Sequence, residues 1–302
     1  MEYNDFQREI LDLLEGIEVK CNEPLSKHTS FRIGGPAEVM IFPKNDEELS
    51  RALKMSALLD CEYRILGAGT NVLAPDEGVS GLVICLKDCL DGIAVLDNNM
   101  LWAAGGVTMS RAAVFAASHG LSGLEFAHGI PGTVGGGVYM NAGAYGGEIA
   151  QICTSVNIMT STGEKKTLAA DEMCFGYRHS CLEENGGIVL GATFLLSEKP
   201  EEEIRATMQD LIGRRKKSQP LELPSAGSAF KRPVGGYAAA LIDQAGLRGF
   251  SIGGAAVSEK HAGFVVNCGN ATSCDVRELL QKVSDLVFDK FAIRLEPEVR
   301  IW

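Results

Sequence analysis

Residues 129–147 read GIPGTVGGGVYMNAGAYGG, with eight glycines in nineteen positions and no charged side chain. Glycine at this density weakens helices and strands, because glycine loses more conformational freedom on folding than any other residue. Such a stretch persists in a folded protein mainly where the backbone approaches another group closely, and outward-pointing peptide N–H groups then form a cradle for an anion. The segment therefore predicts a site for the pyrophosphate of a nucleotide cofactor. The alternative is a glycine-rich structural turn.

The composition is that of a globular protein with an acidic surface. The 302 residues suffice for two or three packed units, and 46% hydrophobic with 22% charged residues is an ordinary balance. A formal net charge of −11 argues against a general nucleic-acid-binding role. No apolar run reaches the roughly 18 residues of a membrane-spanning helix. The N-terminal residues are acidic and amphipathic, so we expect no signal peptide and a cytoplasmic location.

The nine cysteines are odd in number and include no CxxC pair. Most lie in apolar stretches, which favours reduced core thiols over disulfides or zinc ligands. The nearest approach to a ligand pair is Cys85-x-x-x-Cys89, and we expect no metal site.

Short β segments mixed with helices, without a regular βαβ repeat, indicate an α+β fold. A capping box of Asn45 with Glu48 predicts one helix start, and Thr108 predicts another ahead of an alanine-rich stretch. Residues 201–217 form an amphipathic helix with acids at its start and bases at its end. Helices are expected at 3–15, 45–59, 108–118, 201–217, 237–244 and 275–291, and strands at 63–66, 82–86, 93–96, 101–104, 155–160, 188–196, 250–257 and 297–302.

Two more glycine turns precede the glycine-rich segment. Residues 67–72, GAGTNV, follow an expected strand and approach the dinucleotide-binding pattern G-x-G-x-x-G, with Asp88 about 20 residues on. Val72 stands where the third glycine belongs and no helix opens behind it, so we reject that motif; a phosphate-contacting loop of another fold remains open. Residues 30–36, SFRIGGP, form a third turn. Three such turns favour an extended nucleotide such as FAD over a single phosphate.

Three later segments carry polar side chains. FGYRHS contains Arg178, PSAGSAFKRP contains Ser228, and LEPEVR contains Glu296 and Glu298 at strand spacing. Taken singly, they indicate an exposed arginine, a turn serine and edge-strand acids. Ser228 has no histidine nearby in the sequence and no G-x-S-x-G elbow, which argues against a serine hydrolase.

Basic residues are concentrated late in the chain. On a solvated helix end such a run serves solubility, whereas beside a small-molecule site it would supply the positive field that holds a polyanionic substrate. The residues concerned are Arg214, Arg215, Lys216, Lys217, Lys231 and Arg232.

In this order the segments resemble the UDP-N-acetylenolpyruvoylglucosamine reductase (MurB) family of cell-wall precursor synthesis. The resemblance spans nearly the whole chain, from SFRIGGPA and ILGAGTNVL through GIPGTVGG and MNAGAYGG to YRHS, GSAFKRP and LEPEVR. It implies non-covalent FAD in a domain of the p-cresol methylhydroxylase or vanillyl-alcohol-oxidase type at 1–199, with two subdomains divided near 75–85. It also implies a substrate domain at 200–302, whose final strand returns to the active site.

The implied activity is the reduction of UDP-N-acetylglucosamine enolpyruvate to UDP-N-acetylmuramate, with NADPH as co-substrate and FAD as hydride carrier. Arg178 would stabilise negative charge on the substrate carboxylate with help from Glu298, and Ser228 would deliver the final proton. The implied cofactor-binding residues are Arg32, Gly34, Gly67, Gly69, Thr70, Asn71, Gly129, Ile130, Pro131, Gly132, Gly135, Gly136, Asn141, Gly143, Ala144 and Tyr145. The expected substrate-binding residues are Tyr177, Arg214, Lys217, Lys231 and Arg232.

The short spacing between Arg178 and Ser228 is similar to the family branch that lacks a tyrosine-bearing insertion. His128 is a departure, since a small residue is usual before GIPG; the ring would either crowd the flavin or form a buried hydrogen bond. The alternatives are another FAD oxidase or dehydrogenase of the same superfamily and a flavin-binding module without turnover. GSAFKRP with LEPEVR argues against both. We expect a monomer or weak oligomer that binds neither nucleic acid nor membrane.

Overall fold

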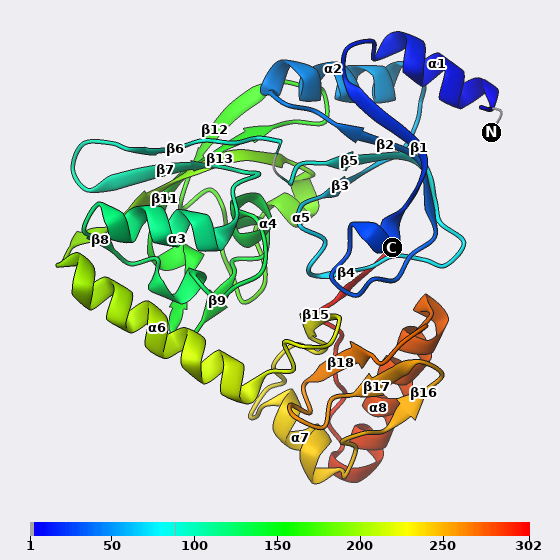
Figure 1. Cartoon of the computed structure of the whole chain (residues 1–302), viewed down its shortest axis with the longest axis vertical. Coiled ribbons are helices and arrows are strands. Elements are labelled where there is room, and N and C mark those ends of the chain that lie inside the picture. Colours follow the sequence, from blue (N-terminus) through cyan, green and yellow to red (C-terminus); the bar gives the residue numbers. More distant parts are fainter. Residues whose placement is uncertain (1–2, 88) are drawn as a thin grey trace. The chain divides into compact units, whose positions relative to one another are not determined.

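The computed structural model describes residues 3–87 and 89–302 (Figure 1). Asp88, at the ribose-acid position of the rejected dinucleotide motif, lies outside the described residues. The chain forms two compact units, each with its own hydrophobic core. The first unit comprises the described residues of Met1–Cys21, Glu38–Ala68 and Ser80–Arg214, and the second comprises Asn22–Ala37, Gly69–Val79 and Arg215–Trp302. The expected domain boundary at residues 199 and 200 stays a prediction.

A four-stranded sheet opens the first unit, in the order β1-β2-β5-β3. Its strands are β1 (Glu18–Pro24), β2 (Pro36–Phe42), β5 (Val79–Cys85) and β3 (Tyr63–Leu66). Strands β3 and β5 pair in parallel. Helices α1 (Asp5–Leu13) and α2 (Asp46–Leu58) contribute Ile10, Leu49 and Leu53 to the core beside Val39 and Ile84 of the sheet.

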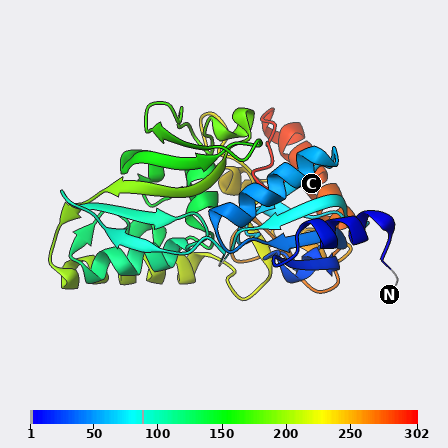
Figure 2. The ribbon, with the colours of Figure 1, turned by 90° about the horizontal axis from the view of Figure 1, so that it is seen from above.

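A five-stranded antiparallel sheet follows, in the order β12-β11-β13-β7-β6. Its strands are β12 (Lys165–Ala169), β11 (Cys153–Met159), β13 (Ile188–Leu195), β7 (Met100–Ala104) and β6 (Ile93–Val95). Helix α4 (Val134–Tyr139) packs against β13 and β7, with α3 (Met109–Ser118) beside it (Figures 1 and 2). This packing places the glycine-rich segment directly against the sheet.

Short elements complete the first unit. They are β8 (Leu121–Ser122), η2 (Glu125–Ala127), β9 (Gly143–Ala144), β10 (Gly147–Glu148), η3 (Ile149–Gln151), α5 (Leu182–Asn185) and β14 (Ser197–Glu198). Helix α6 (Glu201–Ser218) then runs from the first unit into the second.

The second unit is built on a four-stranded antiparallel sheet in the order β15-β18-β17-β16. Its elements are η1 (Leu25–Lys27), β4 (Val72–Leu73), β15 (Ser225–Ser228), α7 (Ala238–Gln244), β16 (Ser251–Ile252), β17 (Ala255–Val257), β18 (Phe264–Asn267), α8 (Ser273–Phe291) and β19 (Arg300–Ile301). Strand β19 pairs in parallel with β4, which comes from a distant part of the sequence. Three separate chain segments therefore complete one core.

The α+β class is confirmed, and so are most of the expected elements. Asn45 and Thr108 cap α2 and α3 as predicted, accepting from the N–H of Glu48 and Arg111. The Glu48 carboxylate accepts from the N–H of Lys44, one residue before the cap, so the reciprocal half of the capping box is displaced.

One expected element is wrong, and one helix was not expected. The single strand expected at 250–257 is a hairpin, in which β16 and β17 flank a Gly253–Gly254 turn with a positive φ of 53° at Gly253. The glycine-rich segment contains a helix, α4, that its composition disfavours.

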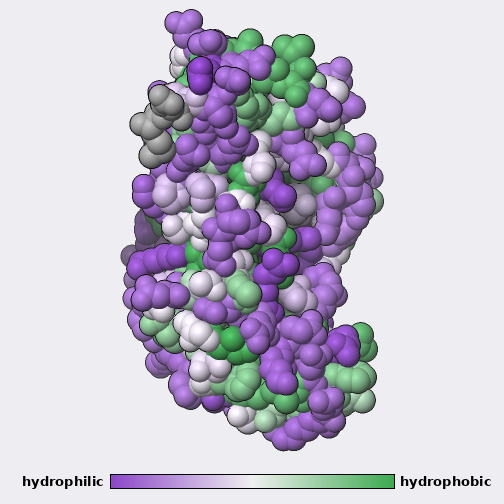
Figure 3. Space-filling model, turned by 90° about the vertical axis from the view of Figure 1, so that its right-hand side faces the viewer, coloured by the Kyte–Doolittle hydropathy of each residue, from purple (hydrophilic) through white to green (hydrophobic). Residues whose placement is uncertain are grey.

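Hydrophilic residues predominate on the face shown in Figure 3, with hydrophobic ones in small groups. Among the described residues, no helix is long and apolar enough to cross a membrane.

Candidate active site

The glycine-rich segment turns most of its helical N–H groups inward. The Thr133 side chain caps α4 by accepting from the Gly136 N–H at 3.2 Å. The N–H groups of Val134 and Gly135 donate to Val107 and Gly105 at 2.7 and 2.8 Å. The prediction that the peptide N–H groups of this stretch point outward is therefore wrong at residues 134–136.

Close contacts explain why glycine is needed at one position of this segment and at one position of the turn at residues 67–72. A Cβ at Gly135 would lie 3.0 Å from the Gly105 carbonyl oxygen, and one at Gly67 would lie 2.8 Å from Thr133 Oγ1. Gly136 differs, because it is exposed and its nearest neighbour would be 3.6 Å away. Among the three glycines of α4, Gly136 is the exposed one, so it offers a helix surface without a side chain to another molecule.

Several backbone N–H groups in and beside the glycine turns have no protein acceptor among the described residues. In the first unit, the N–H groups of Ala68, Gly132 and Thr133 have none among the described residues, and the contact of Gly67 with Thr133 places the two stretches side by side. In the second unit, the N–H of Thr70 and its hydroxyl have none within the described chain. In the first unit, the N–H groups of Ala68 and Gly132 fit the pyrophosphate of FAD, since outward peptide N–H groups bind anions.

Arg178 lies at the tip of a hairpin formed by residues 173–181. The Gly176 N–H donates to the His179 carbonyl at 3.1 Å and the His179 N–H donates to the Gly176 carbonyl at 3.3 Å, which leaves residues 177 and 178 in the turn. Arg178 has a positive φ of 55°, which is rare for a long side chain. Its Nη1 donates to the Gly143 carbonyl at 3.3 Å, and its guanidinium carbon lies 5.4 Å from the centre of the exposed Tyr177 ring. The guanidinium is thus held against the glycine-rich segment.

Two buried side chains tie this hairpin to the glycine-rich segment. Asn141, 2% exposed, donates from Nδ2 to the Gly176 carbonyl at 2.9 Å and accepts from the Ala150 N–H at 2.9 Å. Ser180, fully buried, donates to the Tyr139 carbonyl at 2.7 Å. The sequence interpretation missed Ser180, although it lies in the quoted YRHS motif.

Ser228 ends strand β15 in the second unit. Gly227, with a φ of 78°, lies where the pairing of β15 with β18 is irregular, just before the serine. The next residue, Ala229, accepts from the N–H of Glu298 at 2.9 Å, so the backbone brings the Ser228 and Glu298 segments together. Asn71 joins them, because its Nδ2 donates to the Glu298 carbonyl at 3.2 Å. Three distant parts of the sequence meet here, and Ser228 and Glu298 are both half-buried.

The turn at residues 28–36 packs against the same region. The Ser30 N–H donates to the Gly69 carbonyl at 3.0 Å, and the Ser30 hydroxyl donates to the Ser225 carbonyl at 2.6 Å. Gly34 and Gly69 have positive φ values of 130° and 62°, and a Cβ at either would fall within 2.6 Å of neighbouring atoms. The backbone conformation and the close neighbours therefore require glycine at both positions. Arg32 lies in this turn, also with a positive φ, 56°.

The predicted substrate-binding basic residues differ in their contacts: some are ion-paired, one lies on an aromatic ring and one is exposed. Arg214 forms an ion pair with Asp210 at 2.7 Å on α6, and Lys231 forms one with Glu296. The Arg232 guanidinium carbon lies 4.6 Å from the centre of the Tyr237 ring. Lys217 is exposed near the end of α6.

The remaining predictions concern His128 and the cysteines. His128 is half-buried and its Nδ1 lies 3.2 Å from Ser110 Oγ, which matches the hydrogen-bonded alternative. All nine cysteines are free, but only Cys85, Cys153 and Cys181 are buried, so the expectation of core thiols is wrong for the others. Burial raises the pKa of Cys153 to about 12. Among the described residues no cluster of His, Cys, Asp or Glu could hold a metal ion.

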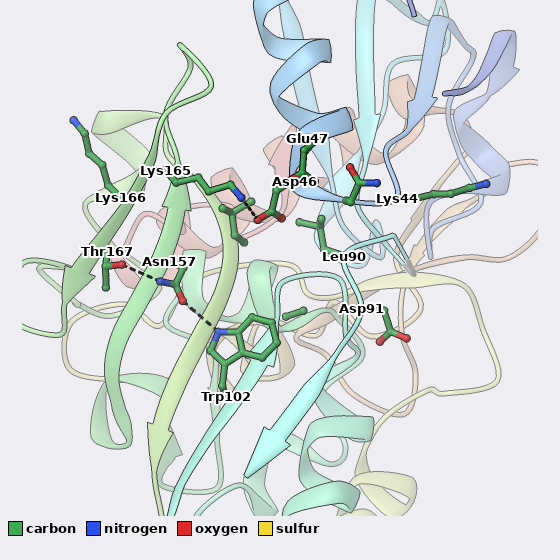
Figure 4. A pocket seen from close by; sticks show the side chains of 13 residues that line it. Lys44, Asp46, Glu47, Leu90, Asp91, Trp102, Asn157, Lys165, Lys166 and Thr167 are labelled. Carbon is green, nitrogen blue, oxygen red and sulfur yellow. Dashed lines mark hydrogen bonds and ion pairs between the residues drawn. The ribbon is translucent and has the colours of Figure 1, made fainter. Parts of the chain in front are cut away.

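A cavity of about 490 Å³ in the first unit contains none of the predicted site residues. The Trp102 indole donates to Asn157 Oδ1 at 3.2 Å, and Asn157 Nδ2 donates to Thr167 at 2.9 Å (Figure 4). Lys165 pairs with Asp46 across its rim at 2.7 Å. The catalytic predictions thus do not involve this cavity.

The fold and the two loop regions define an FAD-binding protein with an added C-terminal domain. Residues 37–169 match the family described as FAD binding domain. Residues 219–302 match UDP-N-acetylenolpyruvoylglucosamine reductase, C-terminal domain. A solved alkyldihydroxyacetonephosphate synthase, 16% identical over 66% of this chain and 41% of its own, has a TM-score of 0.50, which shows a shared fold only.

The chain belongs to the UDP-N-acetylenolpyruvoylglucosamine reductase family. It is 45% identical to the reductase of Agathobacter rectalis over 98% of both chains. It is 47% identical to that of Latilactobacillus sakei over 96% of this chain and 95% of the relative. The crystal structure of the Thermus caldophilus reductase (MurB), 37% identical, covers 95% of this chain and 98% of its own with a TM-score of 0.80. The family resemblance and the expected fold are confirmed.

Proposed function

We propose that the protein reduces UDP-N-acetylglucosamine enolpyruvate to UDP-N-acetylmuramate with NADPH and FAD. The observation that carries the proposal is near-full-length identity of 45% to a reductase of that name, since both FAD-binding and C-terminal regions are retained. An oxidase that shared only the FAD-binding fold would have no reason to retain GSAFKRP and LEPEVR in the second unit.

The residues that would hold FAD are those with available backbone donors. Ala68 and Gly132 in the first unit would contact the pyrophosphate, with Gly136 offering a surface without a side chain. Thr70, in the second unit, is a separate candidate donor. When bound, FAD would supply hydride transfer from NADPH to the methylene carbon of the enolpyruvyl ether.

Arg178 would bind the enolpyruvyl carboxylate. Arginine is suited to this role because its planar guanidinium is a cation that can bind a carboxylate through two parallel hydrogen bonds. Negative charge grows on this carboxylate as the methylene carbon gains hydride, so a fixed cation stabilises the transition state more than the ground state. The bond to Gly143 and the hairpin turn orient the guanidinium before substrate binds.

Ser228 would donate the proton to the ether-bearing carbon. A hydroxyl is a weak acid, so its position at the end of a hydrogen-bonded strand and the strong basicity of the enolate-like intermediate both matter. Glu298, whose backbone is paired beside that of Ser228, would assist. Lys217, Lys231 and Arg232 would attract the diphosphate.

Support for the role of Arg178 comes from backbone strain, which it shares with three other predicted site residues. Four predicted site residues have positive φ values: Arg32, Asn141, Tyr145 and Arg178. Residues other than glycine rarely adopt this conformation, and where they do they are concentrated at functional sites.

The proposal is tested by measuring two half-reactions in Ser228→Ala and Arg178→Ala: reduction of the flavin by NADPH and its reoxidation by the enolpyruvyl sugar. In Ser228→Ala, NADPH should bleach the flavin at a near-normal rate, while reoxidation by the enolpyruvyl sugar should slow by about 10²–10⁴-fold. Arg178→Ala should show the same defect with a raised KM for the sugar nucleotide. Ser251→Ala, on the strand at the opposite edge of the same sheet, is the control. A wild-type holoenzyme that bleaches with NADPH but never reoxidises with this sugar would refute the proposed substrate.

We also propose a cytoplasmic location and a monomer or weak oligomer in solution. The absence of a membrane-spanning helix among the described residues is consistent with this location. Sedimentation at several concentrations of the holoprotein tests the oligomeric state.

A further inference from the structure

We infer that Asn141 is a positioning residue for the reaction, which holds the hairpin that carries Arg178, and is not a ligand of the cofactor. The inference rests on the proposed role of Arg178 in substrate binding. It departs from the sequence interpretation, in which Asn141 belongs to the cofactor-binding set.

Both polar ends of the Asn141 amide are occupied within the protein. Nδ2 donates to the Gly176 carbonyl and Oδ1 accepts from the Ala150 N–H, each at 2.9 Å. The reverse orientation would set NH₂ against N–H and oxygen against oxygen, so the two partners fix the amide. With 2% of its surface exposed, the side chain has little area to offer a ligand.

The bond to Gly176 falls at the base of the turn that holds Arg178. Gly176 pairs with His179, and the two residues between them form the tip. Arg178 itself has a φ of 55°, a strained conformation that persists only where its surroundings enforce it. Asn141 anchors one arm of the hairpin, and Ser180 anchors the other through the Tyr139 carbonyl.

The glycine-rich segment thus forms hydrogen bonds with the hairpin at three residues. Tyr139 and Asn141 hold its arms, and Gly143, two residues on, accepts from the Arg178 guanidinium. Alternate residues of a single stretch fix both the base of the hairpin and the charged group at its tip. Loss of one anchor should therefore move the guanidinium relative to its target carboxylate, and small misplacements of a catalytic group cost up to about 100-fold in rate.

Asn141→Asp isolates the anchor. The two side chains have the same shape, and both tolerate a positive φ. The carboxylate keeps an acceptor for the Ala150 N–H but repels the Gly176 carbonyl. Burial raises the pKa of such a carboxyl, and its protonated form can donate to Gly176 again.

The pH dependence of the Asp variant is therefore diagnostic. We expect kcat/KM for the sugar nucleotide to fall about 10-fold or more at alkaline pH and to recover towards the wild-type value on acidification. The ionisable groups on the adjoining elements are Glu148, Cys174, His179 and Cys181, together with Arg178. Wild-type protein carries all of them, so the ratio of variant to wild type isolates the new carboxyl.

A double-mutant cycle with Arg178→Ala tests whether the effect passes through the arginine. We expect Asn141→Asp to change kcat/KM by less than about 2-fold in the Arg178→Ala background. Asn157→Ala is the matched control, since Asn157 also makes two side-chain hydrogen bonds in the first unit but lies at the unassigned cavity. Its kcat/KM should match that of wild type.

Three results would overturn the inference. The first is an equal loss of kcat/KM from Asn141→Asp in the wild-type and Arg178→Ala backgrounds. The second is a loss of flavin content as the main effect of Asn141→Asp. The third is a loss of kcat/KM that does not depend on pH. If Arg178→Ala alone keeps wild-type kinetics, the proposed role of the arginine fails instead. Hydrogen exchange of the Gly176 and His179 N–H groups in the apoprotein then decides the anchoring: faster exchange in Asn141→Asp supports it, and unchanged exchange refutes it. Should Asn141→Asp not fold, Ser180→Ala removes the second anchor without adding charge, and the same coupling to Arg178 is required.

Discussion

Replacing Gly136 by alanine separates a structural glycine from one that makes room for a cofactor. The residue lies in α4 with helical φ, and the added Cβ would meet Thr133 Oγ1 only at 3.6 Å, an ordinary contact. Alanine in place of glycine within a helix stabilises it by about 0.5–1 kcal/mol. The Tm of the apoprotein should accordingly rise by about 1–4 °C.

The holoprotein should respond in the opposite direction. If FAD rests on the bare surface at Gly136, the methyl group enters a packed contact, which costs about 1–3 kcal/mol. This corresponds to a Kd for FAD raised roughly 5- to 150-fold. Titration of the apoprotein with FAD, followed by quenching of flavin fluorescence, measures the Kd, and thermal unfolding without flavin measures the stability.

Two other glycines serve as controls. Gly213→Ala, in α6 with open space around it, should raise the Tm similarly and leave the Kd unchanged. Gly135→Ala should destabilise even the apoprotein, because its Cβ would crowd the Gly105 carbonyl at 3.0 Å. A Gly136→Ala variant that gains stability and binds FAD as tightly as wild type would show that α4 does not contact the cofactor.

Three further perturbations have defined outcomes. Lys217→Ala should raise the KM for the sugar nucleotide several-fold with kcat unchanged, and by more than Lys231→Ala does, because Lys231 is already ion-paired. The rise in KM should vanish near 1 M salt. An unchanged KM at low salt would contradict the proposed role of Lys217. Gly69→Ala should unfold the second unit or lower its Tm sharply, because φ is 62° and the new Cβ would overlap a carbonyl oxygen; near-normal circular dichroism and Tm would contradict this. Burial lowers the pKa of His261, whose Nδ1 accepts from the Gly263 N–H at 3.1 Å, so unfolding takes up a proton at mildly acidic pH. The stability that depends on neutral His261 should be fully present above about pH 6.5 and should be lost as the pH drops towards the folded-state pKa. Denaturant titrations measure the free energy of unfolding, and in His261→Gln this part of its dependence on pH should be absent.

The sequence predicted elements well where local chemistry decides them. Asn45 and Thr108 cap their helices because the capping bonds join residues three apart. The helix at 201–217 was equally predictable, since its terminal charges complement the dipole. Helix α4 was not, because its stability comes from packing against β7 and β13 and not from the propensity of its three glycines.

The candidate site was predictable as a set of motifs but not as a set of contacts. Glycine was correctly associated with close approach, yet the approaching group belongs to the protein itself: the Cβ atoms of Ala74 and Leu25 at Gly34, and the backbone of His28 at Gly69. Asn141 illustrates the same limit, since its partners Ala150 and Gly176 are set by tertiary structure. Periodicity and motif spacing do not reveal which atoms will face one another across folded loops.

The division of the second unit among three chain segments has a consequence for its synthesis. Strand β4 pairs with β19, whose residues follow it by more than two-thirds of the chain, and Asp76 accepts from the N–H groups of Ser273 and Cys274 at the start of α8. At about 5–20 residues per second, a ribosome exposes the loop at 69–79 for on the order of 10–50 s before its partners emerge. During that interval its backbone groups are open to water and to other chains. Contacts so distant in sequence also slow the search for the native topology. A fragment beginning at residue 219 would contain the whole C-terminal family match and still lack the strand and the aspartate that complete its fold.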